Sequence, residues 1–360
     1  MNFRGSIGRV VACIGAALCL LFGIGLTQQV DAAEPHACAK YDVVKLQVYP
    51  GLIQNLVPWV AEAEGFFKKN CLKPQMLSFP SAPAALAASL QGGLNFISVA
   101  PDTVYVPVAH GFHLKMVAFM NDTVHYALVA GKNAHLPPSS AGMKAMMKAL
   151  VGKRIGVNAL GSTTDILAKS LFTAEGLNYN DAAWVAYGPA SAAIAALDNG
   201  SLDAAMFFGD GMDIAAAATG GRIVVDLRDP AIIKSLPLMA GMPGSSLLWV
   251  AEDSYIHAHP GIVRRFALAN NEAIAWIKQP GNFDKIVKLV GKKAPSPPGV
   301  AHPEALLKMR VRRYIPQEDA HATMSSLEAW AKWDVMMKRI PKVPDINSLL
   351  SRTAAENVIR

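Results

Sequence analysis

The segment with the clearest chemical potential covers residues 158–164 and reads Asn-Ala-Leu-Gly-Ser-Thr-Thr. It combines a glycine with three consecutive hydroxyl side chains, and the apolar pattern that follows predicts a helix over residues 164–174. Free backbone N–H groups at a helix start carry partial positive charge, so this segment is suited to binding an anion. The alternative is that Ser162 or Thr163 merely caps its own helix.

Four further segments place polar or aromatic side chains directly after a predicted strand: residues 49–55, 98–102, 187–188 and 207–210. Asn121 ends another predicted strand. Ligands of open parallel sheets bind outside the carboxyl ends of the strands. We therefore predict a small-molecule site drawn from these segments. The predicted ligand-binding residues are Tyr49, Gln54, Asn55, Ser98, Ala100, Asp102, Asn121, Asn158, Gly161, Ser162, Thr163, Thr164, Tyr187, Phe208 and Asp210.

The charges of these segments bear on the ligand. Asp102 and Asp210 each either cap the following helix or face the ligand, where a carboxylate would favour an N–H donor. None of the five segments contains Arg or Lys. A strongly charged anion would therefore depend on N–H groups and hydroxyls alone, which favours a ligand with apolar or aromatic bulk.

Aromatic residues near the predicted site could stack on such a ligand, namely Tyr49, Tyr187 and either Phe207 or Phe208. The two phenylalanines are adjacent in one strand, so one of them must face the core. We predict that the ligand's most electronegative group lies at residues 161–164. Its bulk would lie toward Tyr49 and the Phe207–Phe208 side.

The sequence offers no recognisable catalytic or cofactor motif. It contains no G-x-G-x-x-G, no Walker loop and no G-x-S-x-G elbow. We interpret the pairs His110/His113 and His257/His259 as ordinary surface or core histidines, not metal ligands. We expect no catalytic residue, no cofactor and no metal.

The elements that position these segments occur twice. Residues 90–102 and 197–210 share one pattern: a helix end, a glycine stop, a short buried strand and a helix start at an aspartate. The match extends backward, since residues 45–49 and 63–66 correspond to residues 154–158 and 174–177. A unit of the form β-α-β-α-β therefore begins near residue 43 and again near residue 152.

The repeat predicts an α/β fold of two similar lobes with mostly parallel sheets and a helical part after residue 260. The second unit is inserted between predicted strands at residues 124–130 and 247–250, so the chain crosses between the lobes twice. We assign residues 33–127 and 246–360 to lobe one and residues 128–245 to lobe two. Two crossing segments form a hinge, and closure about a hinge is a common response to a ligand.

The N-terminus has the pattern of a secretory signal peptide. Arg4 and Arg9 precede an uncharged run over residues 10–26, and residues 30–32 place small residues where a signal peptidase reads. We predict cleavage after Ala32 and export to the periplasm. An uncleaved membrane anchor is the alternative.

Of the four cysteines, Cys13 and Cys19 would leave with the signal peptide. Cys38 lies just before the first strand and Cys71 just after the first helix, so the two are expected to be close. In an oxidising compartment we predict a Cys38–Cys71 disulfide. Two buried free thiols are the alternative.

Composition argues for a globular protein, with 52% hydrophobic and 17% charged residues. The formal net charge is +7, but the basic residues occur as scattered pairs. A scattered distribution does not favour nucleic-acid binding. We expect no nucleic-acid partner.

In order along the chain, residues 58–67 (Pro-Trp-Val-Ala-Glu-Ala-Glu-Gly-Phe-Phe), 90–95, 161–164 and 250–253 resemble the type II periplasmic substrate-binding proteins of ABC importers. The most similar branch handles nitrate, sulfonates, taurine and thiamine-pyrimidine precursors. The resemblance implies a receptor that captures a small organic molecule, a sulfonate, carboxylate or aromatic or pyrimidine compound. It would act as a monomer and deliver that molecule to an ABC permease.

Two other functions stay open at this point. Some proteins of the resembled fold are enzymes, including desulfinases with a cysteine nucleophile, but neither Cys38 nor Cys71 lies on a predicted site segment. A secreted enzyme would have to use Asp102, Asp210 or the hydroxyls of residues 162–164. The third possibility is a subunit that senses a ligand and signals instead of supporting import.

Overall fold

The computed structural model describes residues 38–360, so the predicted signal peptide lies outside the described residues. The first sheet has two ladders. Strand β1 (Asp42–Val48) pairs in parallel with β2 (Leu72–Ser78). Strand β10 (Leu247–Glu252) lies between β3 (Ile97–Val99) and β4 (Leu114–Asn121) and is antiparallel to both. A parallel bridge between Leu46 and Phe96 joins the ladders, which gives the order β2-β1-β3-β10-β4.

The second sheet has the order β7-β6-β8-β5-β9. Strands β6 (Arg154–Val157), β7 (Ala183–Ala186) and β8 (Ala204–Phe208) are parallel. Strand β5 (Tyr126–Ala130) is antiparallel to β8 and to β9 (Arg222–Asp226). All five residues of β8 are buried, as expected of a central strand covered on both faces.

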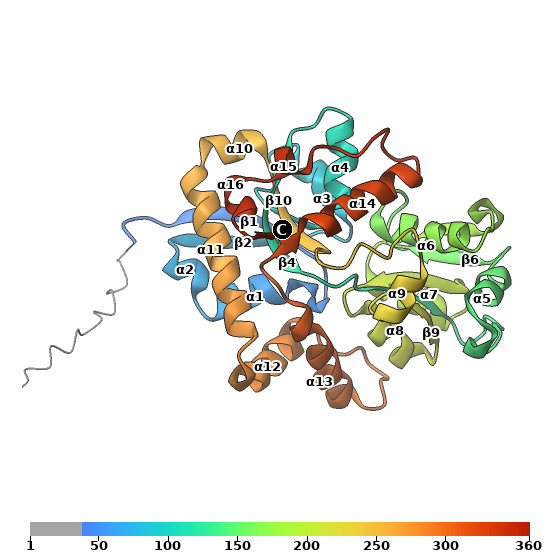
Figure 1. Ribbon diagram of the computed structural model, residues 1–360. Coiled ribbons are helices and arrows are strands. Elements are labelled where there is room, and N and C mark those ends of the chain that lie inside the picture. Colours follow the sequence, from blue (N-terminus) through green and yellow to red (C-terminus); the bar gives the residue numbers. More distant parts are fainter. Residues whose placement is uncertain (1–37) are drawn as a thin grey trace, which may run out of the picture. The chain divides into compact units, whose positions relative to one another are not determined.

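The two strand orders correspond position by position, and Figure 1 shows the sheets with their surrounding helices. Strands β1, β2, β3 and β4 match β6, β7, β8 and β9, while β10 in the first sheet takes the place of β5 in the second. These two are the only antiparallel strands of the two sheets described here, and each is the strand that the chain enters after crossing. The predicted fold of two similar α/β lobes with mostly parallel sheets is confirmed. The exact lobe boundaries remain a prediction.

Helices flank both sheets. Those beside the first sheet in its N-terminal part are α1 (Leu56–Ala63), α2 (Phe66–Lys69), α3 (Ala82–Ser89) and α4 (Asp102–Ala109). Those of the second unit are α5 (Met143–Ala149), α6 (Thr163–Ala174), α7 (Ala190–Asp198), α8 (Gly211–Thr219) and α9 (Pro230–Ser235). The sequence pattern did not predict the short helices α5 and α9.

The C-terminal part is helical, as predicted. Its helices are α10 (Asp253–Ala258), α11 (Pro260–Ile277), α12 (Phe283–Lys293), α13 (Pro303–Tyr314), α14 (Met324–Met336), α15 (Ile346–Leu349) and α16 (Arg352–Ala355). Two short strands, β11 (Ala322–Thr323) and β12 (Val358–Ile359), pair in parallel. Within residues 38–360, no helix combines the length and the apolar character that crossing a membrane requires.

The two crossing segments run beside a third segment. Asp122 N donates to Gln317 O at 3.0 Å, and Gly244 N donates to Asp122 O at 2.7 Å. Ser246 N also donates to Asn121 O at 2.8 Å. The sequence predicted a hinge of two segments. The structure adds the segment that follows α13, which contributes Gln317.

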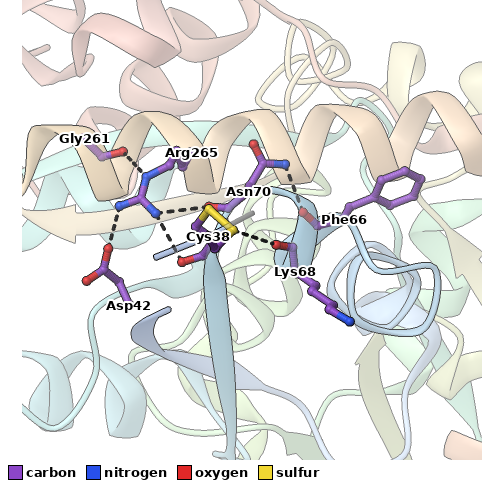
Figure 2. Close-up of a disulfide and its surroundings, with 8 residues drawn as sticks. Cys38, Asp42, Phe66, Lys68, Asn70, Gly261 and Arg265 are labelled. Atoms are coloured by element: carbon purple, nitrogen blue, oxygen red, sulfur yellow. Dashed lines mark hydrogen bonds and ion pairs between the residues drawn. A yellow bond between two sulfur atoms is a disulfide. The ribbon is translucent and has the colours of Figure 1, made fainter. Parts of the chain in front are cut away.

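A disulfide joins Cys38 to Cys71, with 5.5 Å between their Cα atoms, as predicted. Figure 2 shows that Arg265 of α11 reaches the same place. Its Nη1 donates to the carbonyl oxygen of Cys71 at 3.2 Å, and its Nη2 donates to Asp42 Oδ2 at 2.6 Å. The disulfide and Arg265 together hold the start of β1 against the loop before β2 and against α11.

Candidate functional site

A small cavity lies between the residues of the two sheets. One side comes from the end of β1, the segment before α1 and the starts of α3 and α4. The other side comes from β5, β8 and the segment between β6 and α6. Its volume is about 20 Å³, which is little more than the room that one water molecule needs. The lining residues are Tyr49, Gln54, Ala82, Ala100, Tyr126, Asn158, Ser162, Thr163, Thr164 and Phe208.

Eight of the fifteen predicted site residues line this cavity, and two lining residues, Ala82 and Tyr126, were not predicted. Tyr126 was not predicted because the prediction considered only residues at the carboxyl ends of strands. It begins β5, and because β5 is antiparallel to β8, Tyr126 lies opposite Phe208 at the carboxyl end of β8. Ala82 begins α3, and an alanine gives no sequence signal for a site.

The other seven predicted residues lie outside the cavity lining, and five of them have polar groups engaged elsewhere. Asn55 Nδ2 donates to the Tyr49 carbonyl at 2.6 Å, and the Ser98 carbonyl accepts from Tyr49 Oη at 2.8 Å. Tyr187 Oη donates to Met206 O at 2.8 Å. Asn121 Oδ1 accepts from Thr123 N at 2.9 Å, and Gly161 N donates to Asp165 Oδ2 at 2.8 Å. These residues shape the strand ends and do not face the cavity.

The remaining two, Asp102 and Asp210, are buried in ion pairs, so they are not free to receive a ligand amine. Arg310 of α13 donates through Nε to Asp210 Oδ2 at 2.6 Å, and Ile53 N donates to Asp210 Oδ1 at 3.1 Å. Burial raises the pKa of Asp210, whereas the charge of Arg310 lowers it. Arg339 donates through Nη1 to Asp102 Oδ2 at 2.7 Å. Both arginines come from the C-terminal part, far from the segments that the sequence identified.

The start of α6 carries free backbone donors, and its residues Thr163 and Thr164 line the cavity. Amides of Thr163, Thr164 and Asp165 have no hydrogen-bond acceptor among the described residues. The hydroxyls, in contrast, are largely used within the protein: Ser162 Oγ donates to Ala159 O at 2.6 Å, and Thr163 Oγ1 donates to Asp102 Oδ1 at 2.8 Å. Ser162 stands at the N-cap position but its side chain does not cap the helix. An anion at this point would therefore meet amides more than hydroxyls.

Two side chains add neutral polarity to the cavity. Gln54 lines it, and its Oε1 is buried without a partner among residues 38–360. Tyr126 also lines it. Burial and the nearby Asp102 carboxylate raise the pKa of Tyr126, which keeps its hydroxyl protonated as a hydrogen-bond donor.

Three aromatic rings form an apolar part of the cavity lining. The rings of Tyr49 and Phe208 meet edge to face with centroids 5.0 Å apart, and the Tyr126 ring lies 6.4 Å from Phe208. Phe207 points to the other face of its sheet, where it stacks on Tyr187 at 5.7 Å. Phe208 is thus the phenylalanine that faces the site, and Phe207 is the one in the core.

Several contacts join the two sides of the cavity directly. Asn158 Nδ2 donates to Pro80 O at 2.5 Å, and Trp333 Nε1 of α14 donates to Ser170 Oγ of α6 at 2.8 Å. Arg313 Nη1 donates to Asp213 Oδ1 at 2.7 Å. With the bonds to Asp102 and Asp210, these contacts describe a closed cleft. Among the described residues no group of three or more His, Cys, Asp or Glu side chains has the arrangement of a metal site.

The arrangement of two α/β sheets around a small polar cavity agrees with what the sequence matches. The model of the NMT1-like family matches residues 51–291, which covers most of both sheets. The chain belongs to this family. No curated protein matches the sequence closely enough to add a further relative.

Several solved structures have the same fold as this chain. The alkanesulfonate-binding protein SsuA from Xanthomonas axonopodis pv. citri, bound to MOPS, superposes with a TM-score of 0.66 at 16% identity over 89% of this chain and 99% of its own. The periplasmic nitrate-binding protein NrtA from Synechocystis PCC 6803 gives 0.65 at 12% identity over 87% and 86%. The desulfurization enzyme DSZB gives 0.54 at 15% identity over 88% and 98%. The chain therefore has the periplasmic-binding-protein fold.

Proposed function

We propose that this protein is a periplasmic solute-binding receptor that captures a small oxyanion or organic sulfonate in the cavity and delivers it to an ABC permease. The unpartnered amides at the start of α6 carry the proposal. They supply the positive end of a helix at a cavity that contains no free cationic side chain among its lining residues. A binding site of this kind favours a group of low charge, such as a sulfonate or nitrate, over a multiply charged ion.

The aromatic part of the lining supports an organic substituent on that group. Tyr49, Tyr126 and Phe208 contribute aromatic rings to the lining of the same cavity. The cavity volume of about 20 Å³ is little more than one water molecule needs, so even a compact head group would require the lobes to move slightly apart. A larger substituent would have to lie toward the mouth of the cleft or hold the lobes further apart.

The names of structures with the same fold point the same way, since one binds an alkanesulfonate and another binds nitrate. The predicted signal peptide and the disulfide agree with an oxidising, exported location. The permease would be a separate protein, and the receptor would work as a monomer.

A thermal-shift screen tests the proposal. Ethanesulfonate, taurine, MOPS, nitrate, benzoate and a hydroxymethylpyrimidine would each be added to the purified protein. A ligand at one hundred times its dissociation constant stabilises the folded state by about 2.7 kcal/mol. We expect sulfonates or nitrate to raise the melting temperature and ethylamine, an unrelated cation, to leave it unchanged. A screen in which no oxyanion raises the melting temperature would contradict the proposal.

An enzyme is the second candidate, because DSZB shares the fold. Its nucleophile would have to come from the hydroxyls of Ser162, Thr163 or Thr164, since the disulfide occupies both cysteines of the described chain. Incubation of the pure protein with an aromatic sulfinate, followed by detection of released sulfite, separates the two functions. Release of sulfite that is lost in Thr164→Val would favour the enzyme.

A further inference from the structure

Three charged side chains meet beside the cavity and leave an unbalanced charge. Arg339 Nη1 donates to Asp102 Oδ2 at 2.7 Å and to Asp334 Oδ1 at 2.8 Å. Both carboxylate side chains are completely buried, and the Arg339 side chain is 13% exposed. One guanidinium therefore faces two carboxylates. With both carboxylates ionised, the cluster would hold one excess negative charge away from water.

The hydrogen bonds show which carboxylate is less well supported. Asp102 Oδ1 accepts from Thr163 Oγ1, so both of its oxygens have donors. Asp334 Oδ2 is buried without a partner in the described part of the chain. An ionised oxygen without water or a donor is costly, so the proton belongs on Asp334. Burial and the nearby Asp102 carboxylate raise the pKa of Asp334 to about 8, against the opposing effect of Arg339.

The end of α14 directs Arg339 into this cluster. Arg339 N donates to Asp334 O at 2.8 Å, Lys338 N donates to Val335 O at 3.0 Å, and Lys338 is left-handed with φ 58°. This is a Schellman-type helix end, in which the left-handed position is usually glycine. A lysine there indicates that the turn is held by its surroundings.

The same cluster contacts the ligand-binding start of α6. Arg339 Nη2 donates to Gly161 O at 3.3 Å, and Thr163 is the first residue of α6. The Trp333–Ser170 hydrogen bond joins α14 and α6 one to two turns further along. The cluster therefore holds the anion-binding amides against the opposite side of the cleft.

We propose that Asp102, Asp334 and Arg339 form a proton-dependent latch, in which closure of α6 onto α4 and α14 around a ligand places one proton from solvent on the Asp334 carboxylate. The step forms one O–H bond and needs no other reactant. It rests on the proposed receptor function, because it requires the lobes to open and close. Arg339 and Asp334 then act as positioning residues for the amides.

The other groups around Asp334 do not supply the missing charge. Tyr105 of α4 is buried and donates to Leu327 O at 2.9 Å, so it stays neutral. On α6, Asp165 and Lys169 neutralise each other at 2.8 Å. The raised pKa of Asp334 determines how binding depends on pH. Binding is strongest at low pH and weakens as the pH rises toward the closed-state pKa of Asp334. Between the open-state and closed-state pKa values the affinity should fall by about tenfold per pH unit.

Carboxyl ¹³C NMR of the protein without ligand and with saturating ethanesulfonate provides the first test. The Asp334 resonance is assigned by its absence in Asp334→Asn and followed from pH 5 to pH 10. If that variant does not accumulate, Asp334→Glu provides the assignment, because it replaces the Asp334 resonance with that of a glutamate carboxyl group. We expect Asp334 to titrate at a lower pH in the ligand-free protein than in the ethanesulfonate complex, where it should titrate above pH 7. A ligand-free protein in which Asp334 already titrates above pH 7 would overturn the proposal, whether or not any oxyanion binds, because the proton would then be present before closure.

Calorimetry with ethanesulfonate at pH 7.5, in phosphate and in Tris, provides the second test. Wild type should take up a proton on binding and lose affinity between pH 6 and pH 9. Asp334→Asn should bind with an affinity that does not change over that range. Glu328→Gln on α14, which removes an exposed carboxylate, is the matched control and should behave like wild type. An equal loss of affinity at every pH in Asp334→Asn would indicate a purely structural role and overturn the latch. Failure of ethanesulfonate to bind would count against the proposed function, and a ligand-free titration of Asp334 above pH 7 would then still overturn the latch.

Discussion

Thr163 and Asp102 meet across the cleft, and Thr163 Oγ1 donates to Asp102 Oδ1 at 2.8 Å with both side chains buried. Thr163 begins α6 in the second lobe, and Asp102 begins α4 in the first. The bond exists only when the two helix starts come together. It therefore connects the anion-binding amides to closure of the cleft.

Thr163→Val should weaken binding of ethanesulfonate by about tenfold or more. The variant loses a hydrogen bond to a charged group, which contributes roughly 1.5–3 kcal/mol, and it loses that bond in the closed state. Thr163→Ser keeps the donor and should bind like wild type. Ser162→Ala should have the smaller effect, because Ser162 Oγ donates within its own segment. Calorimetry measures all three affinities. If Thr163→Val lowers the stability of the protein but leaves its affinity unchanged, the Thr163 hydroxyl does not contribute to binding.

Tyr126→Phe tests the residue that the strand-end rule missed. Removal of a neutral donor at the cavity should weaken ethanesulfonate binding several-fold, since a typical hydrogen bond contributes about 0.5–1.5 kcal/mol. The matched control is Tyr187→Phe, whose hydroxyl donates to Met206 O outside the cavity. That variant should lose about 1 kcal/mol of stability and keep its affinity. If Tyr187→Phe weakened binding and Tyr126→Phe did not, Tyr126 would not belong to the binding site.

Arg310→Leu should lower the free energy of unfolding by about 3–5 kcal/mol, because it leaves the buried Asp210 carboxylate unpaired. The double variant Asp210→Asn/Arg310→Leu should recover part of this loss, since no charge then stays buried. Arg312→Leu on the exposed side of α13 is the control and should change stability by about 1 kcal/mol or less, because it loses only an exposed contact with the Phe283 ring. Urea denaturation gives the three values. Equal stabilities for Arg310→Leu and wild type would show that the pair does not matter.

Replacement of both Cys38 and Cys71 by alanine should cost about 3–4 kcal/mol, the loop-entropy value for a separation of 33 residues. Reduction of wild type with a strong thiol should produce the same shift in the urea midpoint. A variant as stable as the oxidised protein would mean that Arg265 and the sheet contacts suffice to hold the start of β1.

Stability should fall in mild acid because of His125, which is buried before β5 with Nδ1 at 2.8 Å from Thr123 O. Burial lowers the pKa of His125 to about 4 in the folded state. In the unfolded state its pKa has the ordinary value near 6.5, so the unfolded state binds this proton more readily. The stabilisation is complete above about pH 6.5 and is lost as the pH falls toward 4. On linkage grounds the loss is on the order of 3 kcal/mol. His125→Asn should flatten the stability profile over that range, whereas exposed His113→Asn should not.

The fold was largely predictable because the repeat is visible in the residues themselves. The glycine stops after the first helix of each unit and the buried runs at residues 96–99 and 204–208 are local signals. The antiparallel direction of β5 and β10 could not be predicted from local sequence. Pairing partners of a strand depend on where the chain returns after crossing, and neither strand carries that in its own sequence.

The site was predicted in part for the same reason. Gln54 and residues 162–164 follow strands in sequence and line the cavity, as expected. Arg310 and Arg339 lie more than 90 residues after the last predicted site residue. Arg310 is in α13 and Arg339 follows the end of α14, and their local sequence patterns resemble those of any amphipathic helical surface. The ion-pair partners of Asp210 and Asp102 could not be predicted, because only the tertiary structure brings these arginines to the two aspartates.

The insertion of β10 between β3 and β4 has a consequence for biosynthesis. A chain that emerges from its N-terminus completes every strand of the second sheet once Asp226 has been made, from one uninterrupted stretch that begins at Tyr126. The first sheet has no such stretch, because β3 and β4 face an open slot until Leu247–Glu252 arrives. Long-range pairing of this kind is slow and leaves strand edges unprotected in the meantime. The second lobe can therefore form its complete sheet first. The first lobe cannot complete its sheet until β10 has been made.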